Sequence, residues 1–334
     1  MRVFIKLDQQ ALIKNYNLLI KHCPKNLYLV VKSNAYGHGL NQIISMLSKY
    51  KIYGYVVSTI QEAITIRKSL IYNNVLLLTP YSNFDILNKF NIEVLTSSKS
   101  YTEKILNNPY KINVHAMIET GMHRDGITKE LFLEFYKNNK FKKLLKGVCT
   151  HIYNVNKFQE QYEDFKEIFK EIKFNGLIHF KASSTIDIED DISNSYRVGL
   201  KLYGLHKDYF PVLSMYSNII RIEKVYNNDN VGYGENIINE DGYVYTIGFG
   251  YGDGWPKDLS FSVYINENEL IKICPSCMDH SMFFSKQLFN EESIIEIIGE
   301  HNTVEKIALQ NNMSIYEITT LLSPRINRII KNKK

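Results

Sequence analysis

A ten-residue stretch decides the fold of this chain: Val30-Val31-Lys32-Ser33-Asn34-Ala35-Tyr36-Gly37-His38-Gly39. A lysine ends an apolar run of the kind that forms buried strands, and a turn rich in glycine, histidine and tyrosine follows at once. In a parallel barrel the chemistry lies at the carboxyl ends of the strands. A lysine withdrawn from water there can lose its proton and attack a carbonyl group, although a lysine at a strand end is more often a surface residue. The rest of the sequence therefore decides what Lys32 does.

Short apolar runs alternate with helix-like segments from about residue 26 to 205. The eight strand-like runs are Leu27–Lys32, Ile52–Ser58, Val75–Thr79, Ile92–Thr96, Ile112–Ile118, Leu145–His151, Leu177–Ala182 and Arg197–Tyr203. Apolar residues recur at three- and four-residue spacing in Asn41–Ser48, Lys129–Tyr136 and Phe158–Phe174, which predicts amphipathic helices. Eight strands interleaved with helices predict a (β/α)8 barrel. An open doubly wound sheet is the alternative, but no Gly-x-Gly-x-x-Gly follows any of the runs.

The pattern changes after about Pro211, where helix signals thin out. The strand-like runs are now Ile219–Val225, Tyr243–Phe249, Phe261–Ile265, Leu270–Cys274 and Ile294–Ile298. Asn266–Glu269 is typical of a hairpin turn, and a helical pair, Val304–Gln310 and Ile315–Leu322, ends the chain. We therefore expect an α/β protein of two tightly joined domains. Residues 1–211 would form an N-terminal (β/α)8 TIM-type barrel, and residues 212–334 a mainly β C-terminal domain.

The composition is that of an ordinary globular protein: 45% of the 334 residues are hydrophobic, 22% are charged and the net charge is +5. The N-terminus lacks the apolar segment of a signal peptide, and no run of about 18 apolar residues occurs. Four cysteines are too few for a disulfide scaffold of this size. We expect a cytoplasmic protein that does not bind membranes. The basic run over residues 325–334 is interpreted as a solvated chain end and not as a nucleic-acid site.

Other patterns that suggest chemistry are set aside. Cys274-Pro-Ser-Cys277 is similar to half of a zinc site, but a structural zinc needs four ligands and no second Cys-x-x-Cys occurs, so we expect no metal. The glycine-rich stretch over residues 248–254 lacks the spacing of a phosphate-binding loop and is interpreted as a place where backbone segments approach closely. His115 and His179, on strand-like runs, are interpreted as hydrogen-bonded core histidines.

The stretch around Lys32 resembles the cofactor-lysine segment of the alanine racemase family, Val-Val-Lys-x-Asn-Ala-Tyr-Gly-His-Gly, at every fixed position. Further matches follow in family order from about Ile5 to Arg325: Glu119-Thr-Gly-Met122-x-Arg124-x-Gly126, Thr150-His151, Arg197-x-Gly199-x-x-x-Tyr203-Gly204, Val231-x-Tyr233-Gly234, Gly250-Tyr251-x-Asp253-Gly254-Trp255 and Cys277-Met278-Asp279. The resemblance implies pyridoxal 5'-phosphate as cofactor and the interconversion of L-alanine and D-alanine. In this family that reaction supplies D-alanine for bacterial peptidoglycan.

The resemblance also implies which residues hold the cofactor. Lys32 would bind it covalently, and Tyr36 would hydrogen-bond its phosphate. Further phosphate contacts would come from clustered hydroxyl and N–H donors, which suit an oxyanion: Ser183, Ser184, Gly199 and the backbone N–H of Leu200. Of the two serines, Ser184 is the preferred match.

The resemblance places Arg197 opposite the pyridine nitrogen, with His151 supporting it from the neighbouring strand. Arginine keeps its proton, because its pKa lies above about 12, so it would donate a hydrogen bond and leave the ring nitrogen unprotonated. The ring then withdraws electrons less strongly than one paired with aspartate. We expect this pairing to favour racemisation over transamination, and an Arg197→Glu exchange to raise transamination.

Racemisation requires a proton to leave one face of the substrate Cα and another to reach the opposite face. The resemblance implies that the freed amine of Lys32 serves one face and that Tyr233, from the second domain of the other subunit, serves the other. Arg124 would hold the phenolate side of the cofactor and the substrate carboxylate. The Met278 backbone would contact that carboxylate from the partner subunit, and Tyr251 would line the approach to the site. These roles imply an obligate homodimer with shared active sites.

The chain departs from the family around Arg124. Many members have a carbamylated lysine, an anion that orients the arginine, where this chain has Met117. We expect a bound anion, Glu119 or Asp125 to take its part. The phosphate-binding tyrosine that some members have near the C-terminus is also missing, with Pro324 close to its position.

Other functions stay open at this point. The motifs do not settle the size of the substrate side chain, so a racemase of serine, lysine or several amino acids is one alternative. A non-catalytic pyridoxal-phosphate carrier on a similar barrel is another. Such carriers end after the barrel, whereas this chain continues over residues 212–334 and carries Tyr233 there. A decarboxylase on the same barrel is disfavoured by Tyr233 and by Cys277-Met278-Asp279.

Overall fold

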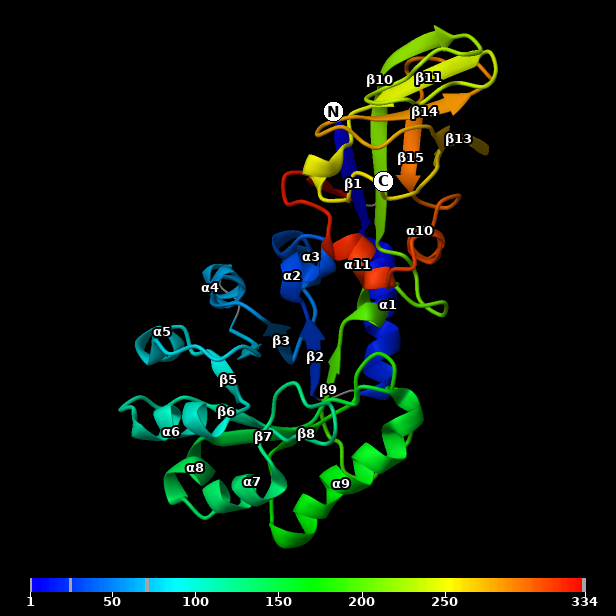
Figure 1. The fold of residues 1–334 in the computed structure, drawn as a ribbon. Coiled ribbons are helices and arrows are strands. Elements are labelled where there is room, and N and C mark those ends of the chain that lie inside the picture. The colour runs from blue at the N-terminus through cyan, green and yellow to red at the C-terminus, as the bar shows by residue number, and fades with distance from the viewer. Residues whose placement is uncertain (1, 24–25, 70–71, 332–334) are drawn as a thin grey trace. The chain divides into compact units, whose positions relative to one another are not determined.

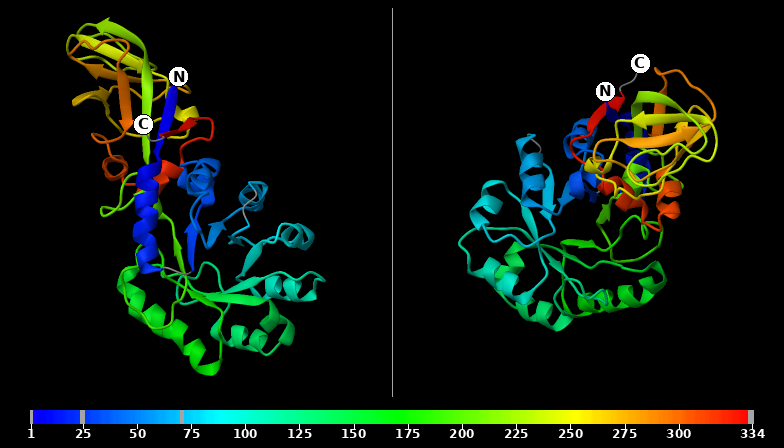
Figure 2. Two further views of the ribbon diagram at one scale, coloured as in Figure 1. Left: turned by 180° about the vertical axis from the view of Figure 1, so that it is seen from behind. Right: turned by 45° about the horizontal axis from the view of Figure 1, so that its top comes forward.

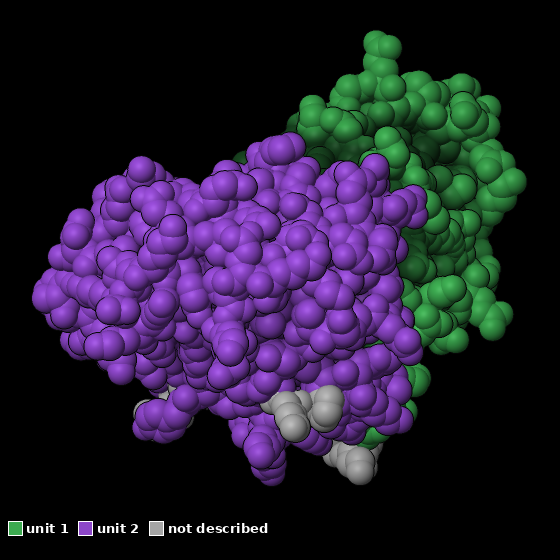
Figure 3. Space-filling view, turned by 90° about the horizontal axis from the view of Figure 1, so that it is seen from below, with its two compact units in different colours: residues 1–15, 34–46, 203–334 green, residues 16–33, 47–202 purple. Residues whose placement is uncertain are grey.

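The computed structural model describes residues 2–23, 26–69 and 72–331, so the last three residues of the basic C-terminal run lie outside the described residues. The chain divides into two compact units, which Figure 3 distinguishes by colour. Unit 1 comprises residues 1–15, 34–46 and 203–334, and unit 2 comprises residues 16–33 and 47–202. Each unit has a sheet of its own.

Unit 2 is built on eight parallel strands in the order β8-β7-β6-β5-β4-β3-β2-β9 (Figure 1). The strands are β2 (Leu27–Val30), β3 (Gly54–Val57), β4 (Asn74–Leu77), β5 (Glu93–Thr96), β6 (Val114–Met117), β7 (Leu145–Cys149), β8 (Leu177–His179) and β9 (Tyr196–Val198). A parallel bridge between Lys181 and Tyr196 joins the two ends of the sheet. The parallel barrel predicted from the sequence is confirmed.

The last barrel strand is shorter than its apolar run. Strand β9 ends at Val198, and the rest of the apolar run Arg197–Tyr203 forms a 3-10 turn, η2 (Leu200–Tyr203). The backbone N–H groups of Gly199 and Lys201 donate to the hydroxyl of Ser183, at 3.3 and 3.4 Å, instead of extending a strand ladder. The strand predicted for residues 200–203 was therefore wrong, because a side chain satisfies the amides there.

Helices cover the outer side of this barrel (Figure 1 and Figure 2). They are α4 (Ile60–Lys68), α5 (Phe84–Lys89), α6 (Lys99–Asn107), α7 (Lys129–Tyr136), α8 (Asn139–Leu144), η1 (Val155–Lys157) and α9 (Phe158–Glu171). Side-chain oxygens that accept a backbone N–H begin several of them: Thr59, Asn83, Ser98, Thr128 and Asn138. The helices predicted at α7 and α9 are confirmed. In the described part of the chain, no helix is both long and apolar enough to cross a membrane.

Unit 1 holds the second sheet, in the order β11-β14-β13-β12-β15-β10-β1-β16, and β11 also pairs with β10. Its strands are β1 (Val3–Asp8), β10 (Leu213–Val225), β11 (Gly242–Ile247), β12 (Val263–Ile265), β13 (Asn268–Lys272), β14 (Ser281–Ser285), β15 (Ile294–Ile298) and β16 (Asn327–Lys331). The short helices after β10 are η3 (Tyr251–Asp253), α10 (Val304–Gln310) and α11 (Ile315–Thr320). The predicted hairpin is confirmed, since Ile265 pairs with Asn268 and Asn266 turns the chain with a φ of 51°.

Strand β1 joins this second sheet although it comes from the N-terminus. It runs antiparallel to β10, where Val3 pairs with Ser217, and parallel to β16. No sequence prediction covered this strand, because its partners lie far along the chain and no local repeat marks them. The division between residues 211 and 212 stays a prediction.

The segment after Lys32 has an unusual backbone. Residues 33 to 36 all have φ between 53° and 55°, so α2 (Lys32–Tyr36), which lies between α1 (Gln9–His22) and α3 (Leu40–Leu47), is a left-handed turn. This conformation costs an L-residue roughly 1–2 kcal/mol. Hydrogen bonds to Asn34 hold the turn: the Gly39 N–H donates to its carbonyl oxygen and the Leu40 N–H to its side chain, both at 2.9 Å. Lys32 is thus followed by a strained left-handed turn that these hydrogen bonds hold in place.

Candidate active site

Lys32 follows strand β2 directly, and the preceding Val31 still donates its N–H to Val56 O of β3 at 2.9 Å. The side chain is partly buried. Burial lowers its pKa, and the positive charges of Arg124 and Arg197 lower it further. A larger fraction of this lysine is therefore the neutral, nucleophilic amine at a given pH than in a lysine exposed to water.

Arg197 lies on β9, next to β2, where it pairs with Tyr28. Its Nη1 donates to Nδ1 of His179 and, at 2.6 Å, to the His179 carbonyl oxygen. Its Nη2 donates to Thr150 O at 2.8 Å. A guanidinium has five N–H groups, so Nε–H and one Nη2–H remain that make no hydrogen bond to a described residue. The acceptors hold one side of the guanidinium and leave donors on the other.

His151 follows strand β7, which is not next to β9, so the prediction that it supports Arg197 from the neighbouring strand was wrong. Among the described residues, His179 and Thr150 make the hydrogen bonds to Arg197 instead. Burial lowers its pKa to about 4, and the positive charges of Arg197, Arg124 and Lys32 contribute. The imidazole is therefore neutral near pH 7. These four residues, all predicted from the sequence, act electrostatically on one another within unit 2. Their surplus of positive charge suits an anionic ligand.

Arg124 has a carboxylate beside it, although Met117 stands where the resemblance implies a carbamylated lysine. Its Nε donates to Asp125 Oδ1 at 3.2 Å. The Glu119 carboxylate accepts the backbone N–H groups of its own loop, including that of His123 at 3.0 Å. Met117 is buried in an apolar cluster with Leu95 and Cys149. Of the partners expected for Arg124, Asp125 is the one in contact.

Hydroxyl and N–H donors converge where β9 gives way to η2. Ser183 is buried, and its Oγ accepts the Gly199 N–H and the Lys201 N–H. Leu200 lies between these two amides in the chain, and Ser184 is exposed beside Ser183. Such clusters of N–H groups bind anions. Four of the five residues predicted to contact phosphate thus lie in this part of unit 2, and the fifth, Tyr36, belongs to unit 1.

The other predicted residues lie in unit 1. The ring of Tyr36 is 5.2 Å from that of Tyr203, and burial raises the pKa of Tyr36 to about 12, so its phenol stays protonated and can donate. Tyr233, Tyr251 and Met278 are 84%, 42% and 57% exposed. These are high values for large apolar side chains.

The loops that carry Tyr233, Tyr251 and Met278 contact one another. Tyr251 N–H donates to Cys277 O at 3.0 Å, and Gly252 N–H to Met278 O at 2.8 Å. Val231, close to Tyr233, is buried in a cluster against which Ile273 packs, close to the Cys277 loop. The structure therefore gathers these three residues on neighbouring loops of unit 1.

Two arginines and two aspartates hold those loops in place. Asp253 has no exposed surface, and its Oδ1 accepts from Arg2 Nη2 at 2.6 Å and from Arg325 Nε at 2.8 Å. Asp279, next to Met278, accepts from the same two arginines at 3.0 and 2.9 Å. The interpretation of the basic C-terminal run as a solvated chain end was therefore wrong for its described part: Arg325 is held in this network, Arg328 is buried, and residues 327–331 form β16.

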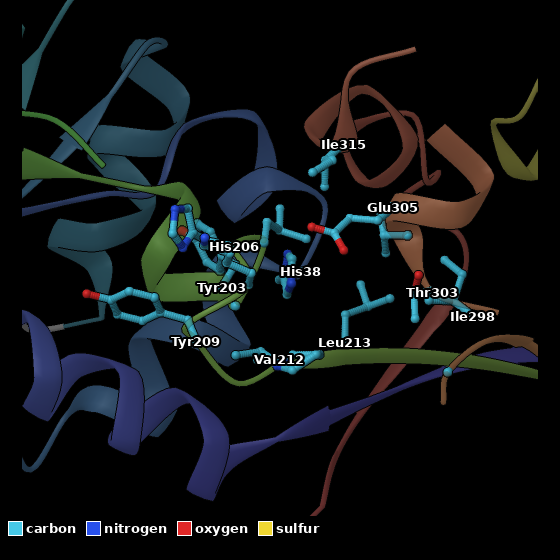
Figure 4. A pocket seen from close by; sticks show the side chains of 16 residues that line it. His38, Tyr203, His206, Tyr209, Val212, Leu213, Ile298, Thr303, Glu305 and Ile315 are labelled. Atoms are coloured by element: carbon cyan, nitrogen blue, oxygen red, sulfur yellow. The ribbon is translucent and has the colours of Figure 1, made fainter. Parts of the chain in front are cut away.

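A pocket of about 220 Å³ in unit 1 contains none of the predicted site residues (Figure 4). His38, Tyr203 and Glu305 are among the residues that line it. The ring of His38 stacks on that of Tyr203 with 4.5 Å between centroids. The pocket is therefore distinct from the candidate site.

His115 and His179 are completely buried and hydrogen-bonded, which confirms their interpretation as core histidines. No sequence pattern indicated, however, that His179 contacts Arg197 directly. The missed signal is the presence of histidines at inward positions of barrel strands, which aliphatic side chains normally fill.

Comparisons with known proteins match both parts of the chain. A family model described as the alanine racemase N-terminal domain matches residues 7–207, and one described as the alanine racemase C-terminal domain matches residues 212–330. The alanine racemase of Streptococcus agalactiae serotype Ia is 27% identical over 357 residues, covering 96% of each chain.

Solved structures show the same fold. The alanine racemase from Bartonella henselae with covalently bound pyridoxal phosphate has a TM-score of 0.90 and 25% identity, covering 99% of this chain and 100% of that one. A histidine racemase from Leuconostoc mesenteroides subsp. sake has a TM-score of 0.86 and 21% identity, covering 99% of this chain and 98% of that one. The family models together span nearly the whole sequence, and the chain belongs to the alanine racemase family.

Proposed function

We propose that this protein is a pyridoxal-phosphate-dependent racemase that interconverts L-alanine and D-alanine, with Lys32 and Tyr233 as its two proton-transfer groups. The observation that carries the proposal is the partly buried Lys32, whose pKa is lowered at the end of a barrel strand beside Arg124 and Arg197. The chain matches its relatives over almost their whole length, and these relatives are named alanine racemases. The D-alanine produced would supply peptidoglycan synthesis. We propose the cytoplasm as the location of the protein.

The donor set fits pyridoxal 5'-phosphate. In unit 2, a doubly charged phosphate suits the Leu200 amide and the hydroxyls of Ser183 and Ser184, next to the Gly199 N–H that donates to Ser183 Oγ. The resemblance assigns a further phosphate contact to the Tyr36 hydroxyl. An aldehyde suits the amine of Lys32, whose lowered pKa favours the neutral form. The spare N–H groups of Arg197 suit a ring nitrogen that accepts a hydrogen bond. When bound, the cofactor withdraws electrons from the Cα of an attached amino acid, which makes its proton removable.

Arg197 supplies a donor that does not release its proton. Its acceptors, Thr150 O and two atoms of His179, fix the plane of the guanidinium. Neutral His151 adds no competing positive charge near it. The ring nitrogen would therefore receive a hydrogen bond instead of a proton, which limits electron withdrawal and favours return of the proton to Cα.

Lys32 and Tyr233 divide the proton transfer between two faces of Cα. A neutral amine takes a proton readily, so Lys32 suits removal from one face. A phenol must lose its proton more easily than free tyrosine to act near neutrality, and positive neighbours provide that. Tyr233 lies on an exposed loop of unit 1, where a second copy of the chain is able to reach it.

We propose a homodimer in which Tyr233 and Met278 complete the partner's site. Exposed apolar side chains gathered in one place mark contact surfaces. Tyr251 and Met278 lie on loops that contact each other, and the residues before Tyr233 pack near the start of the Met278 loop. The C-terminal domain proposed over residues 212–334 would deliver them, while residues 1–211 would hold the cofactor.

Arg124 would bind the substrate carboxylate and the phenolate side of the cofactor. We propose that Asp125 takes the part of the carbamylated lysine of its relatives, because its carboxylate contacts Arg124 Nε at 3.2 Å. The buried sulfur-rich cluster around Met117 leaves no anion at the usual position.

The experiment incubates the purified protein with single L-amino acids in deuterated water. Loss of optical rotation together with deuterium at Cα of alanine supports the proposal. If only serine, lysine or histidine gives this result, that amino acid and not alanine is the substrate. A coloured protein that exchanges no Cα proton would be a carrier. Borohydride reduction followed by peptide mapping should place the cofactor on Lys32, and Lys32→Ala should abolish both the colour and the labelled peptide.

A further inference from the structure

The interior of the barrel in unit 2 is polar. Inward positions of a (β/α)8 barrel are usually filled by Val, Ile and Leu. Here Tyr28 on β2, Glu93 on β5, His115 on β6 and His179 on β8 are all at most 3% exposed. Buried polar groups of this kind persist when each has a partner, so their hydrogen bonds identify what the arrangement does.

The buried groups form a continuous chain that ends at Arg197. His115 Nε2 lies 3.1 Å from Glu93 Oε2, and His115 Nδ1 lies 2.7 Å from His179 Nε2. His179 Nδ1 contacts Arg197 Nη1. The contacts thus connect a carboxylate to a guanidinium through two imidazoles.

Glycines make room for this chain. Gly147 lies on β7, the strand between β6 and β8. A Cβ at this residue would overlap His115 Nδ1 and lie 3.0 Å from His179 Nε2. The two histidines meet only because the strand between them carries no side chain at this level. Gly54 on β3 does the same for the ring of Tyr28, which a Cβ would approach to 2.6 Å.

The chemistry of the ends sets the direction of every hydrogen bond. Arginine is a donor only, so His179 Nδ1 must accept and its proton must lie on Nε2. That N–H donates to His115 Nδ1, so the proton of His115 lies on its Nε2 and points at the Glu93 carboxylate, which is an acceptor only. Each imidazole has a single tautomer that fits, and the donors run from Arg197 to Glu93.

Three groups hold the Glu93 carboxylate. Tyr28 OH donates to Oε2 at 2.9 Å, and Lys146 Nζ bonds to Oε1. The same Nζ donates to Asn74 Oδ1 at 2.8 Å, which fixes its position. Burial raises the pKa of Glu93, but the hydrogen bond from His115 and the positive charge of Lys146 outweigh burial and hold that pKa below its ordinary value. Burial lowers the pKa of both histidines, so they stay neutral between the two charged ends.

We propose that Glu93 and His115 are positioning residues that fix the tautomer of His179 and thereby the orientation of Arg197. The inference rests on the proposed function for its catalytic consequence, because Arg197 is there the donor to the cofactor ring. With an acceptor guaranteed at His179 Nδ1, the guanidinium keeps its proton and its spare donors face one way. A reversed tautomer would set an N–H against Nη1 and displace the guanidinium.

The direct test is nitrogen NMR of the cofactor-free protein labelled with 15N-histidine. His115→Gln and His179→Gln spectra assign the signals. We expect both histidines to be neutral near pH 7 with the proton on Nε2. A proton on Nδ1, or a positive charge on either ring, would overturn the proposal. Because this measurement needs neither cofactor nor substrate, its outcome is separate from whether the protein racemises alanine.

Glu93→Gln tests whether the carboxylate sets the tautomers. Lys146, held by Asn74, requires an oxygen at the Oε1 position, so the amide –NH2 would face His115 Nε2. We expect the tautomers of both histidines to reverse or mix. Asp190→Asn is the matched control, since it makes the same exchange in another buried ion pair of unit 2, with Lys181 at 3.0 Å, outside the chain of hydrogen bonds. Unchanged tautomers in folded Glu93→Gln protein would refute the proposal.

A steady-state arm applies to the loaded enzyme. Glu93→Gln and Gly147→Ala should each lower kcat about tenfold, as loss of an outer partner commonly does, while KM stays within about twofold because neither residue touches the substrate. Gly147→Ala breaks the link between the histidines without changing any donor or acceptor. A rise in KM with unchanged kcat would show instead that these changes disturb substrate binding.

Discussion

The surroundings of Lys32 lower the pKa of its amine, and the proposed reaction uses the neutral form of that amine. Burial lowers its pKa, and Arg124 is the second cause. We expect Arg124→Leu to raise that pKa, because it removes a positive charge from the neighbourhood of the amine. The measurement is the rate of reductive methylation of Lys32 in cofactor-free protein across a pH series, followed by peptide mass spectrometry. Arg124→Lys keeps the charge and serves as the control, so matching profiles for the two variants would contradict the electrostatic cause.

His38 provides a pH test at another single residue. Burial lowers its pKa to about 4 from the ordinary 6.5. The unfolded chain therefore takes up the proton first as pH falls, so stability is complete above about pH 6.5 and is lost towards pH 4. His38→Phe keeps a ring against Tyr203 and removes the titration. Between about pH 7 and 5 its free energy of unfolding should fall by roughly 2 kcal/mol less than that of the unmodified protein.

Urea unfolding at each pH measures this difference. His206→Phe is the control, because His206 is a partly exposed histidine of the same unit. Parallel pH profiles for His38→Phe and the unmodified protein would show that another group causes the acid loss of stability.

At the scale of elements, the left-handed turn α2 depends on close packing against a helix of unit 1. Gly37, just after the turn, has a φ of 79°, and a Cβ there would overlap the carbonyl oxygen of Thr319 in α11. We expect Gly37→Ala to lower the free energy of unfolding by about 3 kcal/mol, since a positive φ costs roughly 1–2 kcal/mol and overpacking roughly 1–3 kcal/mol more. Chemical denaturation at constant pH provides the value.

A second glycine separates the two contributions. Gly234 has a φ of 87°, and a Cβ at this residue would meet no atom within 4 Å, so Gly234→Ala carries the backbone cost alone. Equal losses in the two variants would mean that the approach of α11 contributes nothing.

Elements with a local signal were the ones that the sequence could predict. The barrel strands, α7, α9 and the hairpin at Asn266 follow from apolar spacing and turn residues. Strand β1 could not be predicted, because Val3 pairs with Ser217 and only tertiary structure joins them. The end of β9 was misjudged because Ser183, a side chain from another segment, satisfies the amides of η2.

The candidate site shows the same limit. Motif residues such as Lys32 and Arg197 could be named in advance because their neighbours in sequence identify them. The hydrogen-bonded series of Glu93, His115 and His179 could not be predicted, because each of the three lies on a different strand and no motif surrounds it. Only closure of the barrel brings these side chains to one level, with Gly147 leaving the space between them.

For the whole molecule, the proposed homodimer predicts that two inactive variants restore one another. Lys32→Ala and Tyr233→Phe each remove one proton-transfer group from every site. After the two are denatured and refolded together, about half of the dimers should be mixed, and one of the two sites in each would hold both groups, so about a quarter of the unmodified activity should return. Deuterium incorporation into alanine measures it, and native mass spectrometry counts the mixed dimers. Lys32→Ala refolded with Lys32→Met must stay inactive. If mixed dimers form without activity, the two groups belong to the same chain's site.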